Sequence, residues 1–274
     1  MRAVAFTVDV DRDVNQACQG RSCSVSQGSD APRFDSSARG LREVLRALEG
    51  AEAPGTFFWE GRTALELASR MDLVKAMSGH EVAAHGHEHE DFSGEGTGIP
   101  LDRQAVRGVL ESMEGALDST FGSSPRGFRA PYQRTSPQLM EELSSRGYLY
   151  DSSATVQMVD GRVAPYRNEL GLLEAPVCWS RDRQGRKIVS YLWPYHEGRR
   201  PMSDYLELLD EFEEGLLVMA THSWHMVENY CTGPLPRERA EEGVRELTSF
   251  LNAVRDSGAE VTTIGGFLRR HHGL

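Results

Sequence analysis

Histidines are concentrated in one short segment of this chain. Four of the nine lie within residues 79–92 (GHEVAAHGHEHEDF): His80, His85, His87 and His89. The apolar run at 82–84 predicts the end of a buried strand, and the serine and glycines after residue 92 predict a loop. Imidazole is the commonest metal ligand in proteins, and zinc, nickel, cobalt and iron all accept it. The segment therefore predicts either metal ligands at a strand end or a histidine-rich surface loop.

Other polar side chains stand at the ends of further predicted strands. The first strand, 3–10 (AVAFTVDV), ends in acids, and later strands end in a guanidinium, a carboxylate and an imidazole. The residues concerned are Asp9, Asp11, Arg129, Asp151 and His222. In a parallel barrel the carboxyl ends of all strands face one rim, so these groups are expected to converge there.

Such a set of side chains could hydrolyse an amide or an ester. An aspartate such as Asp11 with two imidazoles leaves one metal position open for water, whose pKa falls to about 7 when it is bound. Asp9 lies two residues earlier on the same side of an extended strand, so it could act as the general base. Arg129 could keep Asp9 ionised, and His222 could protonate the leaving group.

Each of these residues also has a purely structural interpretation. Asp9 and Asp11 could simply end a strand, and Asp151 could cap a turn. Arg129 could serve a structural ion pair, and His222 could be a hydrogen-bonded core histidine. His87, which stands between two candidate ligands, is expected to be their neighbour and not a ligand.

The predicted elements alternate between strand and helix along the whole chain. Helices are predicted at 38–50, with Ser36 and Ser37 as cap, and at 63–79, 101–122, 136–147, 202–215 and 236–258. Residues 15–35 and 154–166 are predicted to be loops, and the first is expected to form a lid. Alternation on this scale favours a distorted (β/α) barrel of about seven parallel strands, with a doubly wound open sheet as the alternative. A single catalytic domain over 1–274 is the simplest organisation.

Composition limits the partners. The 274 residues carry a net charge of −11 with 39% hydrophobic residues, which argues against nucleic acid or an anionic membrane as the main partner. The start, MRAVAFTVDVD, lacks the pattern of a signal peptide, so we expect a cytoplasmic protein. Cys18 and Cys23 are then expected to be free thiols. The composition leaves a homo-oligomer open.

Five motifs in order resemble those of the NodB-like polysaccharide deacetylases, carbohydrate esterase family four. They are FTVDVD, HGHEH, RAPY, YLYDSS and LVMATH, and the resemblance runs from Val4 to about Ile264. It implies a distorted (β/α) barrel that binds one divalent metal, zinc first, with nickel, cobalt or iron as alternatives. The implied metal ligands are Asp11, His85 and His89.

The resemblance also implies roles for the remaining groups. Asp9 would be the base with Arg129 as its partner, and the backbone N–H of Tyr132 would stabilise the oxyanion. His222 would be the acid, tuned by Asp151. Pro131 and Trp224 are expected to contact the substrate.

The first motif departs from the usual family pattern. Val10 separates Asp9 from Asp11 and Arg12 follows, where the family usually has adjacent aspartates and glycine. This spacing resembles the branch of peptidoglycan-deacetylase-like and allantoinase-like proteins. The sequence therefore predicts metal-dependent hydrolysis of a non-peptide C–N bond, with N-deacetylation of an N-acetylated sugar or polysaccharide first. A cyclic-amide hydrolase and a catalytically silent carbohydrate-binding barrel are the alternatives.

Overall fold

The computed structural model describes the backbone of residues 1–18, 21–24 and 31–273 and the side chains of 1–14 and 31–273. The expected free thiols of Cys18 and Cys23 lie outside the side chains that it describes. Within the described part, no helix has both the length and the apolar character needed to cross a membrane.

Strands and helices alternate as predicted over residues 35–151, whereas the strands between residues 150 and 189 follow one another without a helix. The strands are β1 (Arg2–Val10), β2 (Asn15–Cys18), β3 (Arg21–Ser24), β4 (Thr56–Trp59), β5 (Glu81–Ala84), β6 (Gly127–Phe128), β7 (Tyr150–Asp151), β8 (Thr155–Gln157), β9 (Arg162–Val163), β10 (Tyr166–Arg167), β11 (Leu173–Glu174), β12 (Val177–Arg181), β13 (Lys187–Val189), β14 (Glu214–His222), β15 (Glu228–Asn229), β16 (Gly233–Pro234) and β17 (Glu260–Thr262). The helices are α1 (Asp35–Gly50), α2 (Gly61–Ala68), α3 (Leu73–Ala76), α4 (Arg103–Phe121), α5 (Pro137–Ser145), α6 (Trp193–His196), α7 (Met202–Glu211), α8 (Arg237–Asp256) and α9 (Ile264–His272), with 3₁₀ turns η2 (Pro131–Gln133) and η3 (Trp224–Met226).

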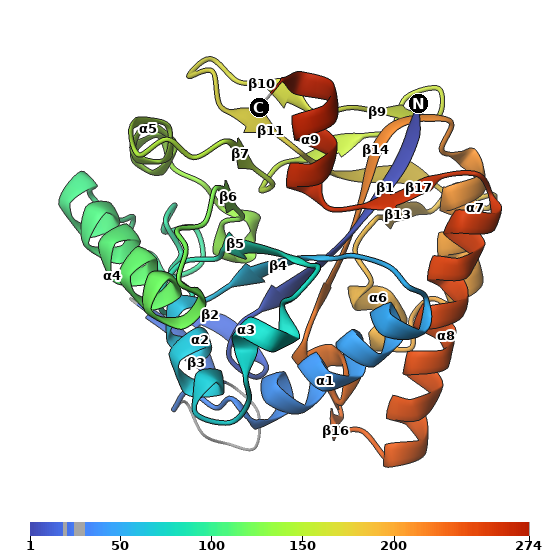
Figure 1. Cartoon of the computed structure of the whole chain (residues 1–274), viewed down its shortest axis with the longest axis horizontal. Coiled ribbons are helices and arrows are strands. Elements are labelled where there is room, and N and C mark those ends of the chain that lie inside the picture. The colour runs from blue at the N-terminus through green and yellow to red at the C-terminus, as the bar shows by residue number, and fades with distance from the viewer. Residues whose placement is uncertain (19–20, 25–30, 274) are drawn as a thin grey trace.

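The main sheet is mostly parallel and curls into a half-barrel (Figure 1). Its order is β10-β11-β7-β6-β5-β4-β1-β14-β12-β13, and the neighbours are parallel except for the terminal pairs β10–β11 and β12–β13. Helices cover its outer surface, where α1 packs on α8 and α2 on α4. The predicted barrel is confirmed in this distorted, partly open form.

Strand β1 lies at the centre of the sheet and is buried on both faces. Val4, Phe6, Val8 and Val10 pack into the larger apolar core beneath the helices. The alternate residues Ala3 and Ala5 join a second apolar cluster on the opposite face. Because side chains alternate along a strand, Asp9 lies on the same face as these alanines, at the carboxyl end of β1.

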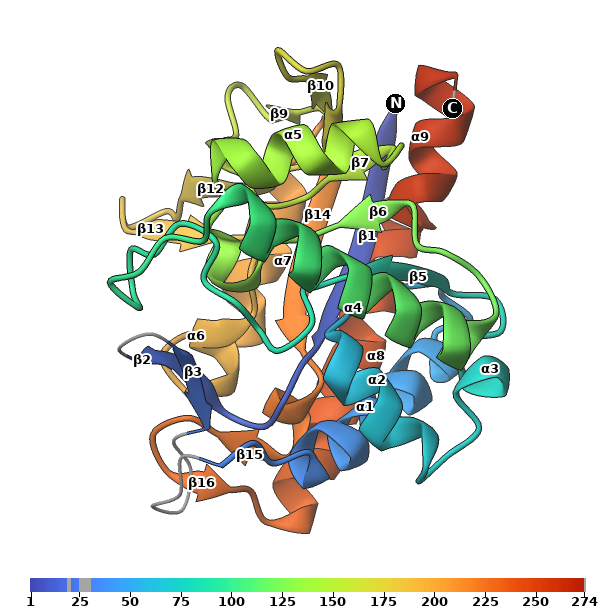
Figure 2. The same cartoon turned by 90° about the vertical axis from the view of Figure 1, so that its left-hand side faces the viewer.

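Three secondary-structure predictions were wrong in detail. The segment 63–79 forms two helices, because α2 ends at Ala68 and the Asp72 carboxylate begins α3 by accepting from the Lys75 N–H at 3.0 Å. The loop predicted at 15–35 contains the β2–β3 hairpin, and the loop at 154–166 contains short strands. Figure 2 shows β2 and β3 at the end of the molecule where β1 and β14 finish. The predicted lid remains a prediction.

The cap of α1 also differs from the prediction. The helix begins at Asp35, so Ser36 and Ser37 stand in its first turn. Their backbone N–H groups donate to the two carboxylate oxygens of Asp13, at 2.9 and 2.6 Å. A carboxylate distant in sequence therefore satisfies the helix N-terminus and ties α1 to the segment that follows β1.

The close packing of α1 against the chain after β14 gives a testable prediction. A Cβ added at Gly40 would lie 1.9 Å from the carbonyl oxygen of Ser223. We expect Gly40→Ala to lower the free energy of unfolding by at least about 1–3 kcal/mol, because the backbone must shift to admit the methyl group. Urea unfolding followed by circular dichroism would measure this.

Gly108→Ala is the matched control, because a Cβ on this exposed face of α4 meets nothing within 4 Å. It should leave stability unchanged or raise it by up to about 1 kcal/mol. Equal unfolding midpoints for the two variants would contradict the packing described here.

Candidate active site

The carboxyl ends of the central strands bring the predicted polar groups together. Asp9 is the penultimate residue of β1 and is in register with His222, the last residue of β14. His85 follows β5 and Arg129 follows β6, which pair as parallel neighbours. The predicted convergence at one rim is therefore what the structure shows for these four residues.

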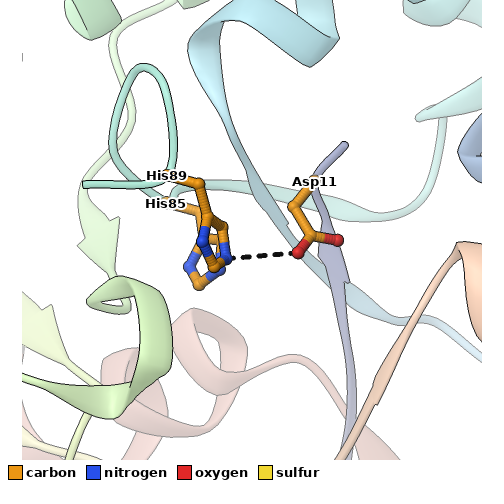
Figure 3. A group of neighbouring side chains, drawn as sticks. All are labelled: Asp11, His85 and His89. Carbon is orange, nitrogen blue, oxygen red and sulfur yellow. Dashed lines mark ion pairs between the residues drawn. The ribbon is translucent and has the colours of Figure 1, made fainter. Parts of the chain in front are cut away.

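Asp11, His85 and His89 form a compact group of metal-ligand type (Figure 3). One ligand atom from each lies within 4.8 Å of the others, and all three side chains are buried. The Oδ2 atom of Asp11 lies 3.2 Å from Nε2 of His89. Three converging donors buried at a strand end match the protein ligand set of an open metal site.

The protonation of His85 is set by its backbone partner. Its Nδ1 atom lies 2.8 Å from the carbonyl oxygen of Arg129. Since a carbonyl oxygen can only accept, Nδ1 carries the ring proton and Nε2 keeps its lone pair. This is the arrangement that orients metal-binding histidines in general.

His89 is also a neutral imidazole at neutral pH. Burial lowers its pKa to about 4, although the charge of Glu60 acts in the opposite direction. Its backbone has a φ of +61°, and its ring packs edge-on against Tyr132 at 4.5 Å between centroids. Left-handed backbone is uncommon for residues other than glycine, and here it turns the imidazole back toward Asp11.

One carboxylate and two neutral imidazoles fit a divalent metal of the zinc, nickel, cobalt or iron type. His87 lies apart from this group. Its Nδ1 atom faces Gly61, where an added Cβ would approach it to 2.6 Å. The structure thus directs His87 toward α2, in agreement with the expectation that it is only a neighbour of the ligands.

Asp9 is held by two hydrogen bonds. The Nη1 atom of Arg129 lies 2.8 Å from Oδ1, and the hydroxyl of Tyr191 lies 3.0 Å from Oδ2. Burial alone would raise the pKa of Asp9, but the charge of Arg129 and its hydrogen bond to the carboxylate act in the opposite direction, and the pKa is lowered. Asp9 is therefore an ionised carboxylate, with lone pairs available as a base.

His222 and Asp9, neighbours on adjacent strands, both line a small pocket of about 160 Å³. The Nε2 atom of His222 lies 2.8 Å from the Tyr191 hydroxyl, and its ring stacks on Trp224 at 5.0 Å with an interplanar angle of 26°. The pocket is lined by Asp9, His85, His89, Ala130, Tyr132, Gln133, Tyr191, Trp193, His222 and Trp224. The lining thus combines the rings of two tyrosines and two tryptophans with one carboxylate and three imidazoles.

Asp151 is placed differently from the prediction. The Ser153 hydroxyl donates to its Oδ1 at 2.7 Å, and Glu174 stands beside it, in register on the parallel strand β11. Burial raises the pKa of both carboxyls. Asp151 and Glu174 line a second pocket, whereas His222 lines the first, and the expected tuning of His222 by Asp151 stays a prediction.

Of the two residues expected to contact the substrate, Trp224 lines the pocket and Pro131 does not. Trp224 lines the pocket, as predicted. Pro131 begins η2 and packs toward Gly86, where an added Cβ would meet its Cγ at 3.1 Å. The left-handed backbone at Tyr132, with φ of +58°, turns Tyr132 to the pocket wall beside Ala130 and leaves Pro131 outside the lining.

Two residues of the site escaped the sequence analysis. Glu60, at the end of β4, accepts from the Arg12 backbone N–H at 2.8 Å and from Arg12 Nε at 2.9 Å. This buried pair fixes the chain next to Asp11. The sequence analysis looked for polar residues directly after apolar runs, and Glu60 fits this pattern because it follows the run TFFW. Tyr191 does not fit it, because it lies after a short edge strand that carries no such apolar run.

Comparison with known proteins shows which proteins this chain resembles. Residues 30–150 match the family model described as polysaccharide deacetylase. The chain is 31% identical over 161 residues to a peptidoglycan deacetylase-like protein of Gibberella zeae (56% of this chain, 44% of that protein). It is 31% identical over 160 residues to a peptidoglycan deacetylase of Helicobacter pylori (55% of this chain, 48% of that protein). Residues 30–150 of this chain are therefore similar to the polysaccharide deacetylase family.

A solved structure supports the fold over the whole chain. A Mycobacterium smegmatis protein described as a polysaccharide deacetylase superposes with a TM-score of 0.67 at 23% identity, covering 99% of this chain and 90% of that one. The sequence matches themselves span about half the length of the curated relatives.

The geometry of the histidine segment predicts which imidazoles bind metal. We expect His85→Ala and Asp11→Asn to lose most of the bound metal, because each removes one of three converging ligands. The measurement is metal content by elemental analysis of protein purified without a metal-affinity column.

His87→Ala is the control from the same segment and should keep about one equivalent of metal. Loss of metal in His87→Ala, or full metal content in His85→Ala, would refute the assigned ligand set.

Proposed function

We propose that this protein is a metal-dependent hydrolase that removes the N-acetyl group from a sugar or polysaccharide. The observation that carries the proposal is the arrangement around the 160 Å³ pocket. An ionised carboxylate, Asp9, and an imidazole, His222, line this pocket beside the group of Asp11, His85 and His89. This arrangement supports a base and an acid that act on one bound amide.

The metal is proposed to be zinc, with nickel, cobalt or iron as alternatives. When bound by these three residues, a divalent metal supplies an activated water and polarises the amide carbonyl. The protein's part is to keep both imidazoles neutral and to hold the Asp11 backbone through the Arg12–Glu60 pair.

The base is assigned to Asp9. Its ion pair with the fully buried Arg129 keeps the carboxylate charged and fixes its direction. Arg129 itself is anchored by Thr7 Oγ1 at 2.9 Å and by the carbonyl oxygen of Ser152 at 3.1 Å. Asp9 is thus positioned to take a proton from the attacking water.

The oxyanion and the leaving group are assigned to opposite walls of the pocket. The backbone N–H of Tyr132 is proposed to donate to the developing oxyanion. His222 is proposed to protonate the nitrogen as the C–N bond breaks. Trp193 packs edge-on against the His222 ring at 5.3 Å, and Trp224 stacks on it, so both indoles shield the proton donor from water.

The small volume of the pocket also supports a second candidate of the same chemistry. About 160 Å³ enclosed by aromatic rings suits a compact amide as well as a single acetylated sugar unit. Hydrolysis of a cyclic amide would use the same base and acid on a C–N bond within a ring. A silent carbohydrate-binding barrel is disfavoured, because the ligand group, the base and the acid are all present together.

The roles of Asp9 and of the metal ligands can be separated. We expect Asp9→Asn to lower kcat for acetate release from N-acetylated sugars by about 10²–10⁴-fold, because the base is lost. Its metal content should stay at the wild-type level, since the ligands are intact. Acetate release by an enzyme-coupled assay and elemental analysis give the two readouts.

Asp210→Asn, at an exposed position on α7, is the control and should behave as wild type. Ring opening of a cyclic amide without acetate release from any N-acetylated sugar would replace the first candidate by the second. Wild-type turnover in Asp9→Asn would remove Asp9 from the mechanism.

A further inference from the structure

Two indoles pack directly against the imidazole of His222. Trp193 and Trp224, which we call the aromatic wall, both line the pocket, and their ring centroids lie 5.3 and 5.0 Å from that of His222. Trp193 belongs to α6 and Trp224 to η3, so the two indoles come from different short elements. The aromatic wall therefore keeps its shape only while α6 and η3 keep their relative position.

His225 lies behind the aromatic wall and packs against both of its indoles. Its ring centroid lies 3.9 Å from that of Trp224 and 4.5 Å from that of Trp193. On another side it stacks on His196, the last residue of α6, at 4.9 Å with an interplanar angle of 14°. The ring is fully buried, and burial lowers the pKa of His225 well below its usual value, so this imidazole is neutral. A single side chain thus contacts both halves of the aromatic wall.

The carboxyl group of Glu197 anchors His225. Its Oε1 atom lies 3.0 Å from Nε2 of His225 and accepts the backbone N–H of Tyr230 at 2.7 Å. Its Oε2 atom accepts the backbone N–H of Cys231 at 3.3 Å. Glu197 directly follows α6, and the two backbone donors lie between β15 and β16. One side chain therefore ties together the end of α6, η3 and the turn between β15 and β16.

Glu197 is placed where a carboxyl group is costly. Its side chain is only 1% exposed, and its ion-pair partner is His225 and none of the lysines or arginines that the structure describes. A hydrophobic residue would fill such a place without the cost of taking a carboxyl group out of water. What Glu197 adds is hydrogen bonds, which fix direction and distance in a way that apolar contact does not.

We propose that Glu197 is a positioning residue, which holds the aromatic wall against His222 through its bond to His225. For its catalytic meaning the inference rests on the proposed function, in which His222 protonates the leaving nitrogen. An indole displaced from His222 would admit water to the imidazole and change the shape of the pocket beside it. The order of the aromatic wall is a property of the protein without substrate, so it can be tested apart from turnover.

Two substitutions at Glu197 separate its hydrogen bonds from its mere presence. Glu197→Ala removes all three bonds. Glu197→Gln keeps an amide oxygen that can accept from His225 and Tyr230. It gives up only the long bond to Cys231, whose N–H also donates to Oδ1 of Asn229 at 2.9 Å. The glutamine variant should therefore restore what the alanine variant loses.

Acrylamide quenching of tryptophan fluorescence tests the order of the aromatic wall. The measurement uses a Trp179→Phe background, which removes the one half-buried indole outside the wall and leaves the buried Trp59. At a temperature where circular dichroism shows every variant folded, we expect Glu197→Ala to raise the quenching constant, because a loosened indole admits the quencher. Glu197→Gln should keep the quenching constant of the parent protein. An unchanged quenching constant in Glu197→Ala overturns the proposal.

Glu246→Ala is the matched control. Glu246 belongs to α8 and also holds α6, because it accepts the hydroxyl of Tyr195, but it does not contact the aromatic wall or His225. Its removal should leave the quenching constant unchanged. An equal rise in Glu246→Ala would show that any loosening of α6 has this effect, and it would overturn the specific role of Glu197.

Kinetics then test the consequence for the reaction. We expect Glu197→Ala to lower kcat for acetate release by about 10- to 100-fold, as is typical for residues that orient a functional group, and Glu197→Gln to stay within about threefold of wild type. Glu246→Ala should keep the wild-type kcat. If Glu197→Ala does not fold, Glu197→Asp, which withdraws the carboxyl group by one methylene, takes its place in both measurements with the same expected directions. Wild-type kcat in the folded variant overturns the proposal.

The two measurements keep this inference separate from the proposed function. If wild type turns over no N-acetylated substrate, the deacetylase proposal fails, but the quenching constants still decide whether Glu197 holds the aromatic wall. If substrate is turned over and Glu197→Ala matches wild type in quenching and kcat, the deacetylase proposal stands and the positioning role is lost.

Discussion

The buried guanidinium of Arg129 is the interaction on which the site depends. Its side chain forms the ion pair with Asp9, and its backbone carbonyl orients His85. A fully buried charge is costly unless every donor is matched. Here Thr7, Ser152 and the face of the Phe58 ring, 4.1 Å away, complete its surroundings. One residue therefore fixes the charge of the proposed base and the tautomer of a proposed metal ligand, so these two features cannot vary independently.

Much of the rim could be predicted from sequence, because it follows from a rule about parallel strands. Asp9, Arg129 and His222 each stand where an apolar run ends, and parallel packing then brings them together. The half-barrel itself followed from the alternation of strands and helices. These inferences needed only local patterns and one general property of the fold.

The remainder depends on register and backbone direction, which local patterns do not reveal. Asp151 pairs with Glu174 because β7 and β11 happen to align these residues. Pro131 leaves the pocket lining because of the left-handed turn at Tyr132. Tyr191 reaches Asp9 from far along the chain, through the alignment of its segment with β14. The positions of these side chains depend on how segments that are distant in the sequence align in the structure.

The in-register pairing of β1 with β14 has a consequence for how this scaffold can change. Because Asp9 and His222 are in register on adjacent strands, the distance between their backbones is set by the spacing of the sheet and not by any loop. The segments that surround the pocket can then change in length or sequence while the distance between the backbones of Asp9 and His222 stays the same. The sheet thus fixes the proposed base and acid, while the segments around the pocket determine the shape of the space beside them.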